Sequence, residues 1–273
     1  MTSFELTRGD TPLLISIPHA GVRLTPEVEA GLTDQAHALT DTDWYMPELY
    51  DFTERLGCSR LRGLYSRYVI DLNRPADDTP LYAGATTGLF PEIDFDGRPL
   101  FRPGLEPAPQ ARTQALAEIW QPYHQALAAE LQRLKARFGY ALLFDAHSIR
   151  SQVPRLFEGP LPDINLGTFE GASCAPALSE RLQALCAAQS TYSWVLNGRF
   201  KGGYMTRHYG NPADNVHAVQ LELSQHTYMA EPEAGVDYPG DAIFPWREER
   251  AARVRPLLEA LMSDMQGWVP QGR

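Results

Sequence analysis

The sequence lacks the features of a membrane-spanning or secreted chain. Over its 273 residues, no apolar run approaches the roughly 18 to 20 residues that are needed to cross a bilayer. Residues 1–5 contain no basic stretch followed by an apolar core, so no secretory signal is visible. Only three cysteines occur, Cys58, Cys174 and Cys186; they cannot all pair, and none lies in a CxxC spacing. We therefore expect reduced thiols and a cytoplasmic protein that does not bind membranes.

Positive charge is also scarce. The 24 Lys and Arg residues are outnumbered by 34 Asp and Glu, which gives a net charge of −10, and no basic cluster is longer than a few residues. Nucleic-acid binding depends on concentrated Lys and Arg, so we expect no nucleic-acid partner. A small acidic ligand remains compatible, because one or two arginines in a pocket are enough to bind it. A serine hydrolase is disfavoured, since no Gly-x-Ser-x-Gly occurs, and nothing in the sequence predicts an oligomeric state.

Segments with the composition of β-strands alternate with segments of helical periodicity. The strand segments are 13–17, 69–72, 141–145 and 216–223, and the helical ones are 43–56, 112–138, 174–189 and 247–265. This alternation predicts a mostly parallel, mixed sheet with helices on both faces. No repeat or linker divides the chain, so we expect a single α/β domain over residues 1–273.

Two histidines follow predicted strands. His19 comes after the strand at 13–17, and His147 comes after the strand at 141–145. Ligands bind at the carboxyl ends of the strands in such sheets, so the two histidines are candidates for binding one metal ion. A lone histidine at a strand end is more often a hydrogen-bonded polar residue, but two of them with nearby acids favour metal binding. Catalytic zinc sites commonly use two His and one carboxylate and leave a position open for water.

The third ligand is expected in the segment 40–44, where two aspartates precede a predicted helix. Asp is also a common helix N-cap, so one aspartate can cap the helix while the other binds the metal. We favour Asp43 as the ligand and keep Asp41 as its alternative. Capping alone remains the competing interpretation for both residues.

A strand carboxylate and an Asn-Arg pair complete the candidate site. Glu222 lies in the strand at 216–223, and a buried strand carboxylate is costly unless it has a partner or a task. It can take a proton from a metal-activated water and deliver it to a leaving nitrogen; a salt-bridged strand Glu is the alternative. Asn73 and Arg74 end the strand predicted at 69–72 and can bind a carboxylate, Arg in a bidentate manner. Before Pro75 the same pair can instead shape a turn.

The order of these residues resembles a known group of enzymes. The order His, acid, Asp-Leu-Asn-Arg, Asp-x-His-Ser and late strand Glu resembles the zinc carboxypeptidase and aspartoacylase group. Members of that group use two His and an acid for zinc, Asn-Arg for a substrate carboxylate and a late Glu as base. More closely, the chain resembles the N-formylglutamate amidohydrolase family from about residue 10 to 250. The motifs that carry the resemblance are PHAG (18–21), TDW (42–44), SRYVIDLNRP (66–75), FDAHS (144–148), LFEG (156–159), LPDINLG (161–167), KGGYMTRHYG (201–210) and QLELSQ (220–225).

This resemblance implies a fold of the zinc-exopeptidase, phosphorylase/hydrolase-like type. It also implies hydrolysis of N-formyl-L-glutamate, a small dicarboxylate, to formate and L-glutamate in histidine degradation. One Zn²⁺ per chain would be held by His19, Asp43 and His147, and Glu222 would be the catalytic base. An amidohydrolase for another N-acyl amino acid is the alternative on the same fold.

Two further points follow from the resemblance. Carboxypeptidases take the first His and the acid from an HxxE spacing, but position 22 is Val22 here, so the carboxylate has to come from elsewhere in the chain. Asn73 and Arg74 would bind one substrate carboxylate, and Arg150 or Arg207 the second. A peptide-cleaving carboxypeptidase is the rival, but the Pro/Gly-rich segments 75–109 and 198–212 have the composition of loops that cover a small pocket.

Overall fold

A mixed β-sheet lies between two layers of helices. The computed structural model describes residues 2–81, 84 and 86–270, and among these, seven strands are ordered β1-β3-β2-β4-β7-β5-β6. The strands are β1 (Phe4–Thr7), β2 (Leu13–Ile17), β3 (Ser59–Gly63), β4 (Ala141–Ile149), β5 (Ile164–Gly167), β6 (Trp194–Leu196) and β7 (Val216–Ser224). The central strands β3, β2, β4 and β7 are parallel, whereas β1 and β5 are antiparallel to their inner neighbours. The predicted α/β class with a mostly parallel, mixed sheet is confirmed.

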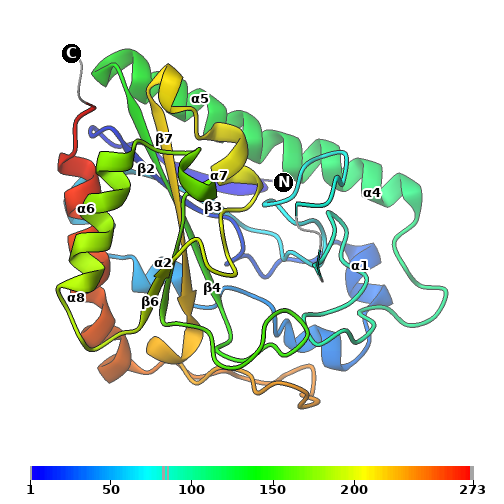
Figure 1. Cartoon of the computed structure of the whole chain (residues 1–273). Coiled ribbons are helices and arrows are strands. Elements are labelled where there is room, and N and C mark those ends of the chain that lie inside the picture. The colour runs from blue at the N-terminus through cyan, green and yellow to red at the C-terminus, as the bar shows by residue number, and fades with distance from the viewer. Residues whose placement is uncertain (1, 82–83, 85, 271–273) are drawn as a thin grey trace.

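Helices cover both faces of this sheet, with α6 and α8 on one side and the long α4–α5 helix on the other (Figure 1). The longer helices are α4 (Pro109–Ala115), which continues through a π-helical turn (Leu116–Trp120) into α5 (Gln121–Phe138), α6 (Pro176–Ala187) and α8 (Glu248–Gly267). The shorter ones are α1 (Pro26–Gly31), α2 (Met46–Leu49), α3 (Thr53–Leu56) and α7 (Tyr204–Tyr209). Single 3-10 turns are η1 (Gln35–Ala38), η3 (Phe169–Gly171), η4 (Pro212–Asp214) and η5 (Gln225–Thr227). No helix of the described residues is long and apolar enough to cross a membrane.

Each face of the sheet has its own hydrophobic core. Along β2, Leu13, Ile15 and Ile17 pack into the core that includes α6 and α8, whereas Leu14 packs into the core that includes α5. Because both faces are covered, apolar side chains are favoured on both faces of the strand rather than at every second position. The four apolar residues of the segment 13–17 follow from this double burial, and the fifth residue, Ser16, is buried with its hydroxyl 3.0 Å from Tyr123 OH.

The prediction of a strand at 69–72 is wrong. These residues form a buried turn, in which the Asp71 N–H donates to Leu89 O (2.8 Å) and Asp71 Oδ1 accepts from the Asn73 N–H (2.8 Å). Their side chains are buried as they would be in a strand, so composition alone does not separate the two cases. The strand beside β2 is instead β3, in which Arg60 and Arg62 alternate with buried residues.

The prediction of one continuous helix at 43–56 is also wrong; the segment contains two short helices. The first helix, α2, begins only at Met46, because Tyr45 has a left-handed backbone with φ 59°. The second helix, α3, begins at Thr53. The helices predicted at 112–138, 174–189 and 247–265 are confirmed as α4–α5, α6 and α8. The π-helical turn before α5 lets the Gln121 N–H donate to Leu116 O, just ahead of Pro122, which has no N–H to donate.

Candidate functional site

The candidate site lies at the carboxyl ends of the central parallel strands. His19 lies two residues after β2, as predicted. His147 lies inside β4, which continues to residue 149 and is longer than predicted. Glu222 lies in β7, where it is paired in register with His147. Because β2, β4 and β7 are parallel neighbours in the sheet, these three residues reach the same edge.

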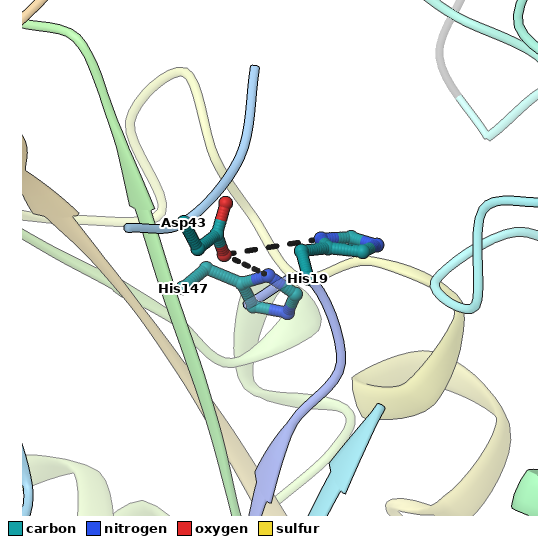
Figure 2. Close-up of side chains that lie close together, drawn as sticks. All are labelled: His19, Asp43 and His147. Atoms are coloured by element: carbon teal, nitrogen blue, oxygen red, sulfur yellow. Dashed lines mark ion pairs between the residues drawn. The ribbon is translucent and has the colours of Figure 1, made fainter. Parts of the chain in front are cut away.

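Two imidazoles converge on Asp43 (Figure 2). The Nδ1 atoms of His147 and His19 lie 3.3 and 3.9 Å from the same carboxylate oxygen, Asp43 Oδ2. One ligand atom from each residue lies within 4.8 Å of the others, and all three residues are buried. The Asp43 N–H donates to His19 O (3.1 Å), and Asp43 Oδ2 accepts from the Ser148 N–H (3.2 Å). Two imidazole nitrogens and one carboxylate oxygen form a donor set that catalytic zinc uses.

A further carboxylate orients each imidazole. Asp71 Oδ1 lies 2.8 Å from His19 Nε2, and Asp145 Oδ2 lies 2.9 Å from His147 Nε2. Histidines that bind a metal through one ring nitrogen usually donate the other N–H to a carboxylate or a carbonyl. Since Nε2 is engaged in both residues, Nδ1 is the nitrogen that faces Asp43. The side chains present therefore fit a metal ion in their donor atoms, and the guanidinium of Arg67 also contacts His19 Nδ1.

Asp41, the alternative ligand, faces away from the histidines. Asp41 Oδ2 accepts from the Phe95 N–H (2.9 Å), and Asp41 Oδ1 lies 3.7 Å from Arg150 Nη2. Burial raises the pKa of Asp41 to about 6. Neither Asp41 nor Asp43 caps a helix, because the N-cap of α2 is Tyr45 and no side chain accepts a capping hydrogen bond there. The structure thus brings Asp43 to the two histidines.

A small cavity of about 60 Å³ opens beside this cluster. Its wall contains His19, His147 and Glu222, together with three guanidinium groups, those of Arg67, Arg74 and Arg199. Both Pro/Gly-rich segments contribute to the wall: 75–109 through Thr86, Thr87 and Phe95, and 198–212 through Arg199, Phe200 and Gly203. Residues 82–83 and 85 of the first segment lie outside the described residues. The arrangement is suited to a small, negatively charged ligand.

Glu222 is a buried carboxylate in the cavity wall. Its Oε2 accepts from Gln220 Nε2 (3.1 Å). Within the described part of the chain no Lys, Arg or His nitrogen forms an ion pair with it, so the interpretation as a salt-bridged strand residue is not supported. Burial raises the pKa of Glu222 to about 8, while the charges of His147 and Arg67 act in the opposite direction. A carboxyl group with this pKa can exchange protons near neutral pH.

Arg74 lies in the cavity wall and is held by its neighbours. Its Nε donates to Thr87 O (2.8 Å), and its Nη2 donates to the hydroxyls of Thr86 (3.1 Å) and Thr87 (3.3 Å). The guanidinium is thus fixed beside two hydroxyl groups that also line the cavity. This arrangement can bind a carboxylate with both charge and hydrogen bonds.

Asn73 packs against the backbone of Gly203. Its Nδ2 donates to Asp145 Oδ2 (3.3 Å), and its Oδ1 accepts from the Met205 N–H (2.8 Å). A Cβ at position 203 would collide with the Asn73 amide, so glycine is required for this close approach. Asn73 therefore connects the carboxylate behind His147 with the segment that carries Arg199.

The other two arginines predicted to bind substrate lie outside the cavity wall. Arg150 is buried and donates from Nη1 and Nη2 to the Asp96 carboxylate (3.1 and 3.2 Å). Arg207 donates to Gly202 O (2.7 Å) and lies over the Phe169 ring at 4.7 Å. The structure does not bring either residue to the histidine cluster.

Comparisons with known proteins identify the family. Residues 11–229 match the family model described as N-formylglutamate amidohydrolase. The chain belongs to the N-formylglutamate amidohydrolase family. It is 60% identical over 261 residues to the N-formylglutamate deformylase of Pseudomonas aeruginosa, with 96% of this chain and 95% of the relative covered. The deformylase of Pseudomonas putida is 56% identical, with coverages of 96% and 94%.

Solved structures show the same fold. An N-formylglutamate amidohydrolase from Ralstonia eutropha superposes with a TM-score of 0.79 at 22% identity, covering 97% of this chain and 98% of that one. A gene product from Agrobacterium tumefaciens superposes with a TM-score of 0.71 at 15% identity, covering 97% and 95%. The resemblance to the amidohydrolase family that the motifs indicate is confirmed.

Four residues of the site received no role from the sequence. Asp145 has a signal, because an Asp-x-His spacing in a strand places both side chains on one face. Asp71 and Arg67 lie in the motif at 66–75. This motif indicates that the segment belongs to the site, but it does not indicate that both side chains lie beside the His19 ring. Arg199 has no signal, because only tertiary packing places its loop at the cavity.

Proposed function

We propose that the chain hydrolyses N-formyl-L-glutamate to formate and L-glutamate in a zinc-dependent reaction of cytoplasmic histidine degradation. The observation that carries the proposal is the 56–60% identity to two N-formylglutamate deformylases over nearly the full length of each chain. The cavity supports it, because a candidate metal site, a buried carboxylate and three guanidinium groups suit a small dicarboxylate amide. The three buried free cysteines are consistent with a reducing compartment.

His19, Asp43 and His147 would hold one zinc ion. When bound, zinc would polarise the formyl carbonyl and lower the pKa of a water molecule. Asp71 and Asp145 keep the two rings in the orientation that directs Nδ1 at the shared site. Loss of either carboxylate would therefore act on the metal site through the histidine that it orients.

Glu222 would carry the proton through the reaction. It accepts a proton from the attacking water as the water oxygen bonds to the formyl carbon. It then donates this proton to the amine nitrogen of glutamate as the C–N bond breaks. The second proton of the attacking water leaves the formic acid product, which gives formate, and protonates the free amine. The pKa of about 8 that burial gives Glu222 suits a group that both accepts and returns a proton near neutral pH.

Asn73 and Arg74 would bind the α-carboxylate of the substrate. Arg74 contributes a charged, planar donor set, with the hydroxyls of Thr86 and Thr87 beside it. Asn73 lies between this group and the His147 side chain. Substrate bound here would lie with its amide near Glu222, which lines the same cavity.

The choice between the two aspartates gives a direct test of the metal site. We expect Asp43→Asn to raise the dissociation constant for zinc by more than about 100-fold. Losing a residue that hydrogen-bonds a metal ligand already costs 10- to 100-fold in metal affinity, and losing a ligand itself should cost more. Asp41→Asn is the matched control, because Asp41 pairs with the Phe95 N–H and Arg150 rather than with the histidines. Competition with a chelator measures the zinc dissociation constant of each variant. Weaker zinc binding in Asp41→Asn than in Asp43→Asn would make Asp41 the ligand instead of Asp43.

The substrate is tested by comparing kcat/KM for N-formylglutamate, N-formylleucine and a short peptide. We expect a clear preference for N-formylglutamate, because the cavity offers cations for two carboxylates and N-formylleucine has only one. Equal values for N-formylleucine would contradict a site built for a dicarboxylate. Preferential cleavage of the peptide would instead favour the carboxypeptidase function.

A further inference from the structure

The side-chain carboxylate of a bound dicarboxylate needs a cation that the assignments above do not provide. Of the described arginines, Arg67, Arg74 and Arg199 line the cavity. We propose that Arg199 binds this side-chain carboxylate and determines the preference for an acidic substrate. The proposal rests on the proposed function, since it assigns the second subsite of the same cavity.

Arg199 is held at the cavity by contacts on its own loop and on a neighbouring one. Its Nε donates to Leu156 O (2.7 Å), and its guanidinium lies over the Phe200 ring at 5.4 Å. Leu156 and Phe200 themselves line the cavity. A guanidinium restrained in this way loses less conformational entropy when it binds a carboxylate than a freely rotating one.

The other two cavity arginines lie at other parts of the wall. Arg67 lies at the metal end, where its Nη2 contacts His19 Nδ1 and lies 3.7 Å from Asp71 Oδ2. Arg74 is fixed beside Thr86 and Thr87, where the α-carboxylate is assigned. Arg199 is the remaining guanidinium that the described cavity wall supplies for a second carboxylate.

The wall around Arg199 also suits the methylene groups of a glutamate side chain. Phe95, Ile149, Leu156 and Phe200 are the apolar members of the cavity wall. They belong to, or pack against, a small hydrophobic cluster that is separate from the two cores of the sheet. An apolar wall with a cation within it matches a short aliphatic chain that ends in a carboxylate.

The test compares N-formylglutamate with N-formylglutamine, which has the same shape but no side-chain charge. For Arg199→Gln we expect kcat/KM for N-formylglutamate to fall roughly 10- to 100-fold, the size of a lost hydrogen bond to a charged group. The value for N-formylglutamine should stay the same or rise. Arg199→Lys should lie between, because it keeps the charge without the planar fork.

Arg207→Gln is the matched comparison, because Arg207 also lies over an aromatic ring but outside the cavity wall. We expect it to keep the wild-type ratio between the two substrates, and zinc content and Tm verify that each variant is folded and loaded. An unchanged ratio in Arg199→Gln, with wild-type turnover of N-formylglutamate intact, would overturn the assignment of Arg199 alone. A wild-type protein that does not hydrolyse N-formylglutamate would overturn the proposed function as well.

Discussion

His147→Ala is expected to lose zinc and activity together. His147 Nδ1 lies 3.3 Å from Asp43 Oδ2, so the substitution removes one of three candidate ligands. It also leaves Asp145, which is buried and lies 2.9 Å from His147 Nε2, without that partner. Since outer partners of a metal ligand are worth 10- to 100-fold in affinity or activity, we expect losing the ligand to cost more than about 100-fold in each. Elemental analysis and kcat on one sample measure both.

The control for this variant is His217→Ala. His217 is equally buried, and its Nδ1 accepts from the Ala175 N–H (3.1 Å), but it does not line the cavity. It should lose stability through lost packing yet keep its zinc and its kcat per folded molecule. Zinc should also raise the Tm of the wild type and of His217→Ala but not of His147→Ala, because a ligand stabilises only the state that binds it. Full zinc content in His147→Ala would remove this residue from the site.

Glu222→Gln is expected to keep the metal and the fold but to lose turnover. The amide keeps the shape of the side chain and can still accept from Gln220, which lies 3.1 Å from Oε2, but it cannot take up a proton. General acid–base catalysis is typically worth roughly 10²–10⁴ in rate, and we expect kcat to fall on that scale. Near-normal kcat in a folded, zinc-loaded variant would exclude Glu222 as the proton carrier.

Stability distinguishes this role from a structural one. In the metal-free protein, burial raises the pKa of Glu222 to about 8 from its ordinary value of 4.5. Folding therefore takes up a proton at this residue between these two pH values, and its contribution to the free energy of unfolding falls as the pH rises through that window. Glu222→Gln removes this dependence, so Tm at neutral pH should stay the same or rise.

Glu130→Gln is the matched control, because the pKa of Glu130 is lowered by folding whereas that of Glu222 is raised. Glu130 is buried but accepts from Arg133 Nη2 (2.6 Å), and although burial alone raises its pKa, the hydrogen bonds from Arg133 and Ser59 bring it below the usual value. The stability that it contributes is present above its unfolded pKa and is lost as the pH falls through its folded pKa. Glu130→Gln should therefore lower Tm at neutral pH and keep kcat.

Local sequence patterns predict the strands and histidines of the site well. The apolar run of β2 and the alternation of β7 are signals that each segment carries by itself, and His19 and His147 follow from their positions relative to strands. The same kind of pattern predicts a strand wrongly at 69–72. This turn is buried like a strand, but its backbone hydrogen bonds go to Leu89 O and to the Asp71 side chain rather than to a neighbouring strand. The short strand β3 is not predicted, because of its three buried residues, Ser59, Leu61 and Gly63, only Leu61 has a large apolar side chain.

The arginines show what sequence patterns do not contain. Arg150 and Arg207 lie close to site motifs in the chain, yet the fold directs them to Asp96 and Gly202 rather than into the cavity. Arg199 reaches the cavity only because its loop packs against Leu156. Positions that depend on how two loops meet are set by tertiary packing and have no local periodicity to reveal them.

The central claim is that zinc at His19, Asp43 and His147 supports deformylation of N-formylglutamate. The most direct measurement is turnover of N-formylglutamate by chelator-stripped protein as zinc is added back in known amounts. We expect negligible turnover without metal, a linear recovery, and saturation near one zinc per chain. Full turnover by protein that contains no detectable metal would contradict the account.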